Sequence, residues 1–216
     1  EDGVLKTNRN SAVGIMEEFC GKYPDFGLKG TFFVNLGLSV FSGKGTLSER
    51  LEYLIDKGFE IGNHTLNHVD LTTINSIEKM QQEIGGNQKK MHELIPGYKM
   101  FAFSLPYGTT SKNLAEYVIS GEYEGEKYEN SAILKVGAEP ALSSANKNFN
   151  PYSIPRVRAP GINPVKFDLN WWVENISKND EFVSDGNPNT ITIPKDELEN
   201  VAIDRINNKE LIIYEK

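Results

Sequence analysis

Two of the three histidines of the chain, His64 and His68, are four residues apart and directly follow a short apolar run. At this spacing both imidazoles lie on one side of a helical turn, where they can hold one cation as neutral ligands. Two histidines do not complete a metal site, so a third ligand, usually a carboxylate, must come from elsewhere. The alternative is a pair of surface histidines that bind nothing.

The residues before the histidines predict a strand over 59–62, and Gly62-Asn63 then turn the chain. His64 and His68 are therefore expected at the carboxyl end of that strand, which is the edge where alternating α/β folds build their sites. We expect further strands at residues 29–35, 100–105, 132–136, 154–159, 191–193 and 211–214, and helices at residues 11–23, 46–58, 76–94, 110–119 and 164–176. Gly85-Gly86 are expected to interrupt the third helix, and residues 121–130 to form a loop.

Composition limits the classes of protein that fit. The 216 residues suit a single domain over 1–216. A net charge of −7 without a Lys/Arg cluster argues against a nucleic-acid partner, and no apolar run reaches transmembrane length. Cys20 excludes an internal disulfide and is expected in the core, while His92 is expected on the surface. Strands alternating with helices indicate an α/β fold with a mainly parallel sheet.

Three stretches occur in the order known from one family. They are Gly30-Thr31-Phe32-Phe33-Val34, the helix at 51–58, and Glu60-Ile61-Gly62-Asn63-His64-Thr65 with His68. As a set they resemble the polysaccharide deacetylase (NodB-type) domain of carbohydrate esterase family 4. The resemblance implies a distorted, incomplete (β/α) barrel, and an open doubly wound sheet is the alternative. It also implies a divalent metal, most often Zn²⁺.

In that family an Asp-Asp pair ends the first strand and supplies the catalytic base and the third metal ligand. Here only Glu1-Asp2-Gly3 could correspond to it, with Glu1 as the base and Asp2 as the ligand beside His64 and His68. The alternative is that Asp2-Gly3 is a turn after the motif. The first strand would then lie upstream of Glu1 and be missing from this chain.

The segment Ser104-Leu105-Pro106-Tyr107-Gly108 resembles the family's Arg-x-Pro-aromatic-Gly motif. The resemblance implies that Pro106 and Tyr107 contact substrate and that the Tyr107 backbone amide faces an oxyanion. Ser104 stands where the family has arginine, so Arg156 or Arg158 is a candidate to replace that charge. Only one of the two can face inward, because alternate residues of a strand point to opposite faces, and a surface ion pair is the alternative reading for both. No histidine follows His92, which leaves the family's general acid without a counterpart.

The leading hypothesis is a hydrolase that acts on carbon–nitrogen bonds other than peptide bonds and removes acetyl groups from an N- or O-acetylated glycan. Peptidoglycan, chitin-like polymers and exopolysaccharides are the substrates that the resemblance implies, with an extracytoplasmic, cell-wall-associated location. Two alternatives stay open. One is a catalytically silent barrel that binds cell-wall glycan, and the other is a metal hydrolase of a non-sugar amide.

Overall fold

The computed structural model describes residues 5–177 and 183–215. The chain divides into two compact units, residues 1–133 and 134–216. The prediction of one domain over 1–216 stays a prediction. Among the described residues, no helix combines the length and the apolar character that crossing a lipid bilayer requires.

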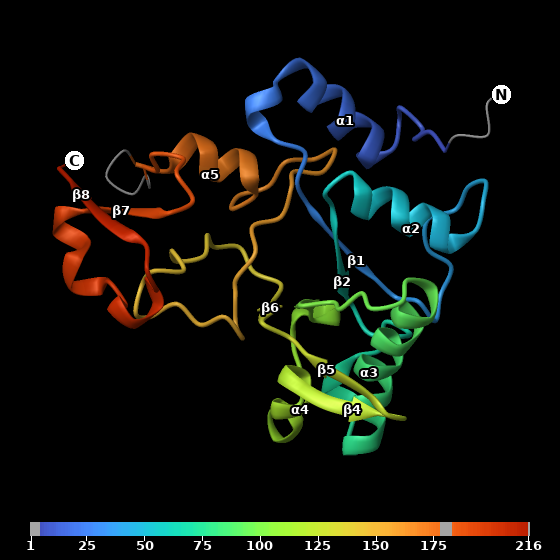
Figure 1. Cartoon of the computed structure of the whole chain (residues 1–216). Helices are drawn as coiled ribbons and strands as arrows, with labels where there is room; N and C mark the ends of the chain where they lie inside the picture. Colours follow the sequence, from blue (N-terminus) through green and yellow to red (C-terminus); the bar gives the residue numbers. More distant parts are fainter. Residues whose placement is uncertain (1–4, 178–182, 216) are drawn as a thin grey trace. The chain divides into compact units, whose positions relative to one another are not determined.

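A four-stranded sheet organises the first unit (Figure 1). Its strands are β1 (Thr31–Val34), β2 (Glu60–Asn63), β3 (Ala102–Ser104) and β6 (Ala132–Leu134), in the order β1-β2-β3-β6. β1 and β2 pair in parallel with Thr31 opposite Glu60, and β2 and β3 pair in parallel with Asn63 opposite Phe103. The predicted α/β class is confirmed, and within the described residues the sheet stays open, as expected of an incomplete barrel.

Four helices accompany this sheet: α1 (Ala12–Lys22), α2 (Leu47–Asp56), α3 (Ile77–Leu94) and α4 (Glu116–Ile119). The first three begin where the sequence places a capping side chain. The Ser11 hydroxyl accepts from the Gly14 N–H, and the Ser76 hydroxyl accepts from the Lys79 N–H. Thr46 and Glu49 form a reciprocal capping box at the start of α2. The predicted helix starts at Ser11, Thr46 and Ser76 are therefore confirmed.

Helix α3 contributes to both apolar clusters of the first unit. Met80 and Ile84 pack in one cluster with Phe103 of β3, and Met91 packs in the other with Ile61 of β2. The face of α3 that meets the sheet also carries buried polar side chains. They are Glu83, Asn87 and Gln88. Of these, Glu83 and Asn87 reach the site described below.

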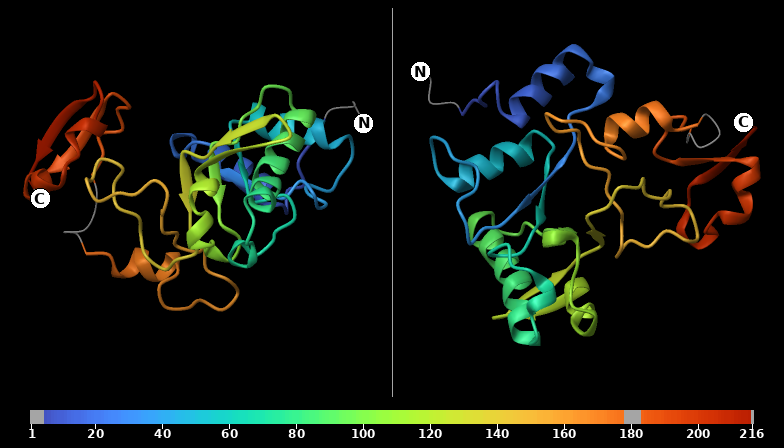
Figure 2. Two further views of the ribbon diagram at one scale, coloured as in Figure 1. Left: turned by 90° about the horizontal axis from the view of Figure 1, so that it is seen from below. Right: turned by 180° about the vertical axis from the view of Figure 1, so that it is seen from behind.

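Two expectations about this region were wrong. Residues 121–130 form no loop but the antiparallel hairpin of β4 (Ser120–Tyr123) and β5 (Glu126–Glu129). Glu124 and Gly125 turn it with φ angles of 48° and 82°, as a two-residue turn that follows the strand twist requires. Gly85-Gly86 do not interrupt α3 either. The missing side chain at Gly85 lets Tyr123 and Tyr128 pack closely against the helix, and this packing favours its continuous course. Figures 1 and 2 show the hairpin lying along α3.

The second unit contains α5 (Leu169–Asn175) and a parallel pair of strands, β7 (Thr190–Pro194) and β8 (Glu210–Tyr214), which Figure 2 shows side by side. The expected strand over 154–159 was wrong, since only Ile154 makes a bridge, to Leu134. Pro155 and Pro160 lack the N–H that a strand needs. Short 3₁₀ helices complete the chain at Pro24–Phe26, Leu71–Thr73, Pro106–Gly108, Lys112–Leu114, Lys195–Asn200 and Ile203–Arg205.

Two single-residue expectations have different outcomes. Cys20 is half-buried, not a core residue, and its thiol lies 3.5 Å from the Gly27 carbonyl oxygen. His92 is exposed, as predicted, and its Nδ1 lies 3.0 Å from a carboxylate oxygen of Glu126.

Candidate metal and substrate site

The structure brings His64 and His68 together at the carboxyl end of β2. Their ring centroids are 4.8 Å apart, with the ring planes at 72°. The backbone N–H of His64 donates to the Val34 carbonyl at 3.1 Å, so the backbone of the first histidine is anchored where β1 ends. Both side chains are partly accessible. The turn therefore presents two imidazoles to one small region of space.

The tautomer of His64 follows from its neighbour on β3. Nδ1 lies 2.6 Å from the Ser104 carbonyl oxygen. A carbonyl oxygen only accepts, so Nδ1 carries the hydrogen, and in the neutral imidazole Nε2 then keeps the lone pair. A histidine that binds a metal commonly donates its other N–H to a carbonyl in this way, which fixes the ring and raises the basicity of the ligating nitrogen. The geometry of His64 thus fits a metal ligand.

His68 lies against the aromatic ring of Tyr107. The two centroids are 5.1 Å apart, with an interplanar angle of 72°. Tyr107 belongs to the short 3₁₀ helix after β3, and its side chain is 64% exposed. The histidine turn and the Pro106-Tyr107 segment are therefore neighbours in the structure. Pro106 itself is buried.

Buried amide side chains hold the start of the turn. Asn87 of α3 accepts from the Leu36 N–H at 2.8 Å and donates to the Val34 carbonyl at 2.9 Å and to the Asn63 side chain at 2.8 Å. Asn63 in turn accepts from the Thr65 N–H at 2.9 Å. The Asn87 amide therefore connects the ends of β1 and β2 and sets the course of the chain into the histidine turn.

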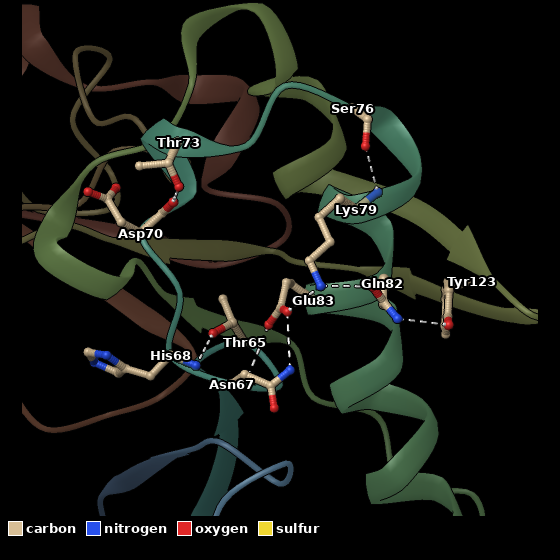
Figure 3. A network of polar contacts seen from close by, with 10 residues as sticks. All are labelled: Thr65, Asn67, His68, Asp70, Thr73, Ser76, Lys79, Gln82, Glu83 and Tyr123. Carbon is tan, nitrogen blue, oxygen red and sulfur yellow. Dashed lines mark hydrogen bonds and ion pairs between the residues drawn. The ribbon is translucent and has the colours of Figure 1, made fainter.

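The end of the turn is held by a carboxylate. Glu83 of α3 accepts from the backbone N–H of Asn67 at 3.0 Å and from its side-chain amide at 3.1 Å. The Thr65 hydroxyl accepts from the His68 N–H at 3.0 Å. Figure 3 shows the imidazole of His68 pointing away from α3, on the other side of the turn from these contacts. The polar contacts fix the backbone and leave the ring directed outward.

Glu83 and Asn87 were missed by the sequence analysis, although the sequence contains a usable indication. Glu83 lies three residues after Met80 and Asn87 four residues after Glu83, within the stripe that continues to Met91. A polar residue on the apolar face of a helix is expected to find a buried partner. This pattern predicts that the residue has a buried partner but does not identify it.

No third candidate ligand accompanies the histidine pair among the described residues. In residues 5–177 and 183–215, no three His, Cys, Asp or Glu side chains are grouped so that they could share one metal ion. The expected ligand Asp2 and the expected base Glu1 lie outside the described residues. Their roles stay predictions.

Ser104 is buried beside the site, with 1% of its surface exposed. Its hydroxyl oxygen has no hydrogen-bond partner within the described residues. A serine at this place cannot supply the guanidinium charge that the resemblance implies here. The position corresponding to the family's arginine is therefore filled by a small neutral side chain.

Arg158 belongs to the second unit, in a segment without regular structure. The N–H groups of Trp171 and Val165 hold the pKa of Asp168 below its usual value, and the charge of Arg158 lowers this pKa further. Arg158 is thus close enough to Asp168 to act on its carboxylate. Its predicted role in substrate binding stays a prediction.

Trp171 and Trp172 belong to a local aromatic cluster in the second unit. The Trp171 ring contacts those of Trp172 and Phe167, with centroids 5.0 and 4.6 Å away. The Trp172 indole N–H donates to the Ala138 carbonyl at 2.7 Å. Asp168 caps α5 by accepting from the Trp171 N–H. Trp171 and Trp172 are half-buried.

The sequence model of the polysaccharide deacetylase family matches residues 17–125, just over half of the chain. The matched range contains β1, β2, the histidine turn, α3, β3 and Tyr107. The chain therefore belongs to the polysaccharide deacetylase family. No match was found among curated protein sequences.

Several solved structures are similar to this chain over part of their length. A polysaccharide deacetylase from Bacillus cereus is 16% identical, with a TM-score of 0.44, over 59% of this chain and 36% of its own. A deacetylase from Streptococcus pyogenes, in complex with acetate, is 17% identical, with a TM-score of 0.46 over 61% and 53%. A family 4 acetyl xylan esterase from Clostridium thermocellum, with a cobalt ion, is 17% identical, with a TM-score of 0.42 over 65% and 60%. The chain thus spans only part of the length of each.

Proposed function

We propose that this protein is a metal-dependent hydrolase that removes acetyl groups from an N- or O-acetylated glycan. The observation that carries the proposal is the pair of imidazoles at the carboxyl end of β2, 4.8 Å apart, with Nδ1 of His64 committed to the Ser104 carbonyl. Membership in the polysaccharide deacetylase family supports the same reaction class.

His64 and His68 would hold the metal, with Asp2 as the proposed third ligand. Imidazole nitrogens suit Zn²⁺ well, and a set of three protein ligands with one open position is typical of catalytic zinc. A bound divalent cation polarises an acyl oxygen and makes water a better nucleophile near neutral pH. Zn²⁺ is the proposed ion because the two ligands of the described turn are both nitrogens.

The chain's own residues then orient the substrate and move protons. The Ser104 carbonyl holds the hydrogen on Nδ1 of His64, which orients the ring and leaves Nε2 as the nitrogen that would bind the metal. The exposed Tyr107 ring borders His68, where it can lie against the sugar that carries the acetyl group. In the proposal Glu1 removes a proton from the attacking water, and the Tyr107 backbone amide stabilises the developing oxyanion. Pro106 and Arg158 complete the proposed substrate contacts.

The proposed substrate is an acetylated cell-wall or extracellular polysaccharide, such as peptidoglycan, a chitin-like polymer or an exopolysaccharide. These are large polymers outside the membrane, so the proposed location is extracytoplasmic. The support is family membership, since no ligand-specific feature of the site distinguishes these polymers from one another.

A second function, binding of cell-wall glycan without catalysis, is favoured by Ser104. This residue is buried and carries no charge where the family's arginine is expected. A base without that charge partner loses an orienting contact. The silent barrel would bind acetylated oligosaccharide and release no acetate.

The test combines metal content with acetate release from chito-oligosaccharide and peptidoglycan fragments. Wild type is compared with His68→Ala and with His92→Ala, whose histidine is exposed and bonded to Glu126. The hydrolase predicts about one Zn²⁺ per chain and acetate release, both lost in His68→Ala and kept in His92→Ala. Oligosaccharide binding without acetate release would favour the silent barrel. No metal in any variant after incubation with Zn²⁺ would exclude the hydrolase.

A further inference from the structure

Glu83 is a carboxylate at the centre of the first unit, with 0% of its surface exposed. It lies on the inner face of α3, between Met80 and Ile84 of the apolar core. A buried carboxylate loses its hydration, so its burial is tolerated only when hydrogen-bond donors or a cation replace the lost water. The nature of these partners indicates what the carboxylate does.

The hydrogen-bond and ion-pair partners of Glu83 are residues of the histidine turn and one lysine. One carboxylate oxygen accepts from the Asn67 N–H at 3.0 Å, and the other accepts from the Asn67 side-chain amide at 3.1 Å. The Glu83 backbone carbonyl accepts from the Leu66 N–H at 2.7 Å. Lys79, one helical turn earlier, pairs with the carboxylate at 3.2 Å. Figure 3 shows the Glu83 side chain between Asn67 and Lys79.

Asn67 directly precedes His68 in the chain, so its peptide group sets where the His68 side chain begins. His68 has a φ of 56°, in the left-handed region that a non-glycine residue enters only when its surroundings hold it there. On the side of α3, the Glu83 carboxylate constrains the backbone before His68 by accepting hydrogen bonds from two N–H donors of Asn67. The chain in this way fixes the second imidazole without touching its ring.

We propose that Glu83 is a positioning residue that fixes the Leu66-Asn67-His68 backbone, so that His68 can share a metal ion with His64. This inference rests on the proposed function, because it requires that the histidine pair binds a metal. Glu83 acts through Asn67 and has no contact of its own with the reacting atoms. Ordinarily, loss of a residue that orients a metal ligand weakens metal binding about 10- to 100-fold.

Gln88 provides a matched control on the same helix. Its side chain is also buried, with 2% of its surface exposed. It donates to the Tyr98 carbonyl at 2.9 Å and accepts from the Met100 N–H at 3.0 Å, both away from the histidine turn. Gln88→Ala therefore removes a buried polar anchor of α3 and leaves the contacts of Asn67 intact.

The experiment measures Zn²⁺ affinity by competition with a chelator, in the full chain, for wild type and for Glu83→Ala, Glu83→Gln and Gln88→Ala. We expect Glu83→Ala to bind Zn²⁺ about 10- to 100-fold more weakly, with the absorption spectrum of bound Co²⁺ also changed. Gln88→Ala should bind as wild type does. Glu83→Gln should recover most of the affinity, because an amide oxygen still accepts from the Asn67 N–H.

Hydrogen exchange at the Asn67 amide gives a readout without metal. Protection of this amide should be lost in Glu83→Ala and kept in Gln88→Ala. Should Glu83→Ala not fold, Asn67→Ala at its exposed position serves instead and should weaken Zn²⁺ binding several-fold. Tight Zn²⁺ binding by wild type with unchanged affinity in these variants would overturn the inference alone. Absence of Zn²⁺ binding by wild type would overturn the proposed function and this inference together.

Discussion

Three residues around the site adopt left-handed backbone angles although none is glycine. Thr65, His68 and Tyr107 have φ values of 70°, 56° and 57°. Such conformations cost free energy and persist only where the surrounding contacts impose them, which is frequent at functional sites. Thr65 and His68 are held by hydrogen bonds, of which the one at Thr65 is buried, whereas Tyr107 has an exposed side chain. Tyr107 is therefore the position where strain can be removed with the least damage to the core.

Replacing Tyr107 by glycine should separate stability from function. Glycine removes about 1–2 kcal/mol of left-handed strain and costs about 0.5–1 kcal/mol of backbone entropy. We therefore expect the free energy of unfolding in urea to stay within about 1 kcal/mol of wild type. Acetate release should fall, because the ring beside His68 is lost. Tyr107→Ala keeps the strain and loses the ring, so an alanine variant more stable than the glycine variant would contradict this account.

At the residue scale, the sequence predicted that the two histidines form a pair but not which residues anchor their backbone. His64 and His68 were predicted as a pair from residue type and spacing, and the structure places their rings together. The expected helical turn was wrong, since Thr65 and His68 have φ angles of 70° and 56°. The anchors Glu83 and Asn87 are sixteen and twenty-four residues from their partners Asn67 and Asn63 in the chain. Nothing in local spacing links these partners, since only the packing of α3 on the sheet brings them into contact.

Helix α3 shows how an element depends on its neighbour. A Cβ atom built at Gly85 would lie 2.8 Å from the Tyr123 Cβ and 3.1 Å from Tyr128 Cδ1, on the hairpin. At Gly86 the nearest side-chain atom would be 3.4 Å away, which is an ordinary contact. Packing of the hairpin on α3 therefore requires glycine at position 85 but leaves room for a larger side chain at position 86.

Alanine substitutions at the two glycines should have opposite signs. Alanine in a helix interior is favoured over glycine by about 1 kcal/mol, so Gly86→Ala should stabilise the protein by up to about that amount. Gly85→Ala should destabilise it by about 1–3 kcal/mol, because the hairpin must move away. Urea unfolding of both variants measures the difference. Equal stabilisation by both would mean that the hairpin does not pack closely on α3.

The start of α2 gives a pH-dependent prediction. The Thr46 N–H donates to the Glu49 carboxylate at 2.6 Å, and this bond, with one from the Thr46 hydroxyl, holds the pKa of Glu49 below its usual value. A carboxylate with a lowered pKa in the folded state contributes stability above its unfolded pKa. This contribution is lost as the pH falls through the folded pKa.

Glu49→Gln should therefore be less stable than wild type near pH 7. The difference in unfolding free energy should shrink as the pH falls below about 4, where the carboxyl becomes protonated. Urea unfolding between pH 7 and pH 3 measures this. Glu52→Gln, at an exposed position of the same helix, is the control and should show no such trend. A constant difference across the whole range would show that the capping carboxylate is not the cause.

The helices were predicted more successfully than the hairpin for a physical reason. Ser11, Thr46 and Ser76 form their capping bonds within three residues, so local sequence specifies these helix starts. The hairpin has polar strands whose few apolar residues, Tyr123 and Tyr128, face α3. Its stability comes from that distant partner, which the local pattern cannot show.

At the scale of the whole molecule, the two units differ in how much apolar core they contain. Both buried apolar clusters lie within residues 13–133. Among the described residues from 134 onward, the buried apolar side chains are those of Ala145, Ile193, Ala202 and Ile206. Four side chains, two of them alanine, bury too little apolar surface to stabilise some 80 residues alone. The second unit is therefore not expected to be stable in isolation.

The single-domain prediction can be tested because the tryptophans report on one unit only. Trp171 and Trp172, the chain's two tryptophans, belong to the second unit, whereas α1 to α4 belong to the first. Urea unfolding can be followed by tryptophan fluorescence and by circular dichroism at ~222 nm, where helices absorb. The two transitions should coincide if the chain unfolds as one cooperative domain. We expect coincidence, because the second unit lacks a sufficient core. A fluorescence transition at lower urea than the helical transition would instead establish two domains, with the histidine site on the more stable one.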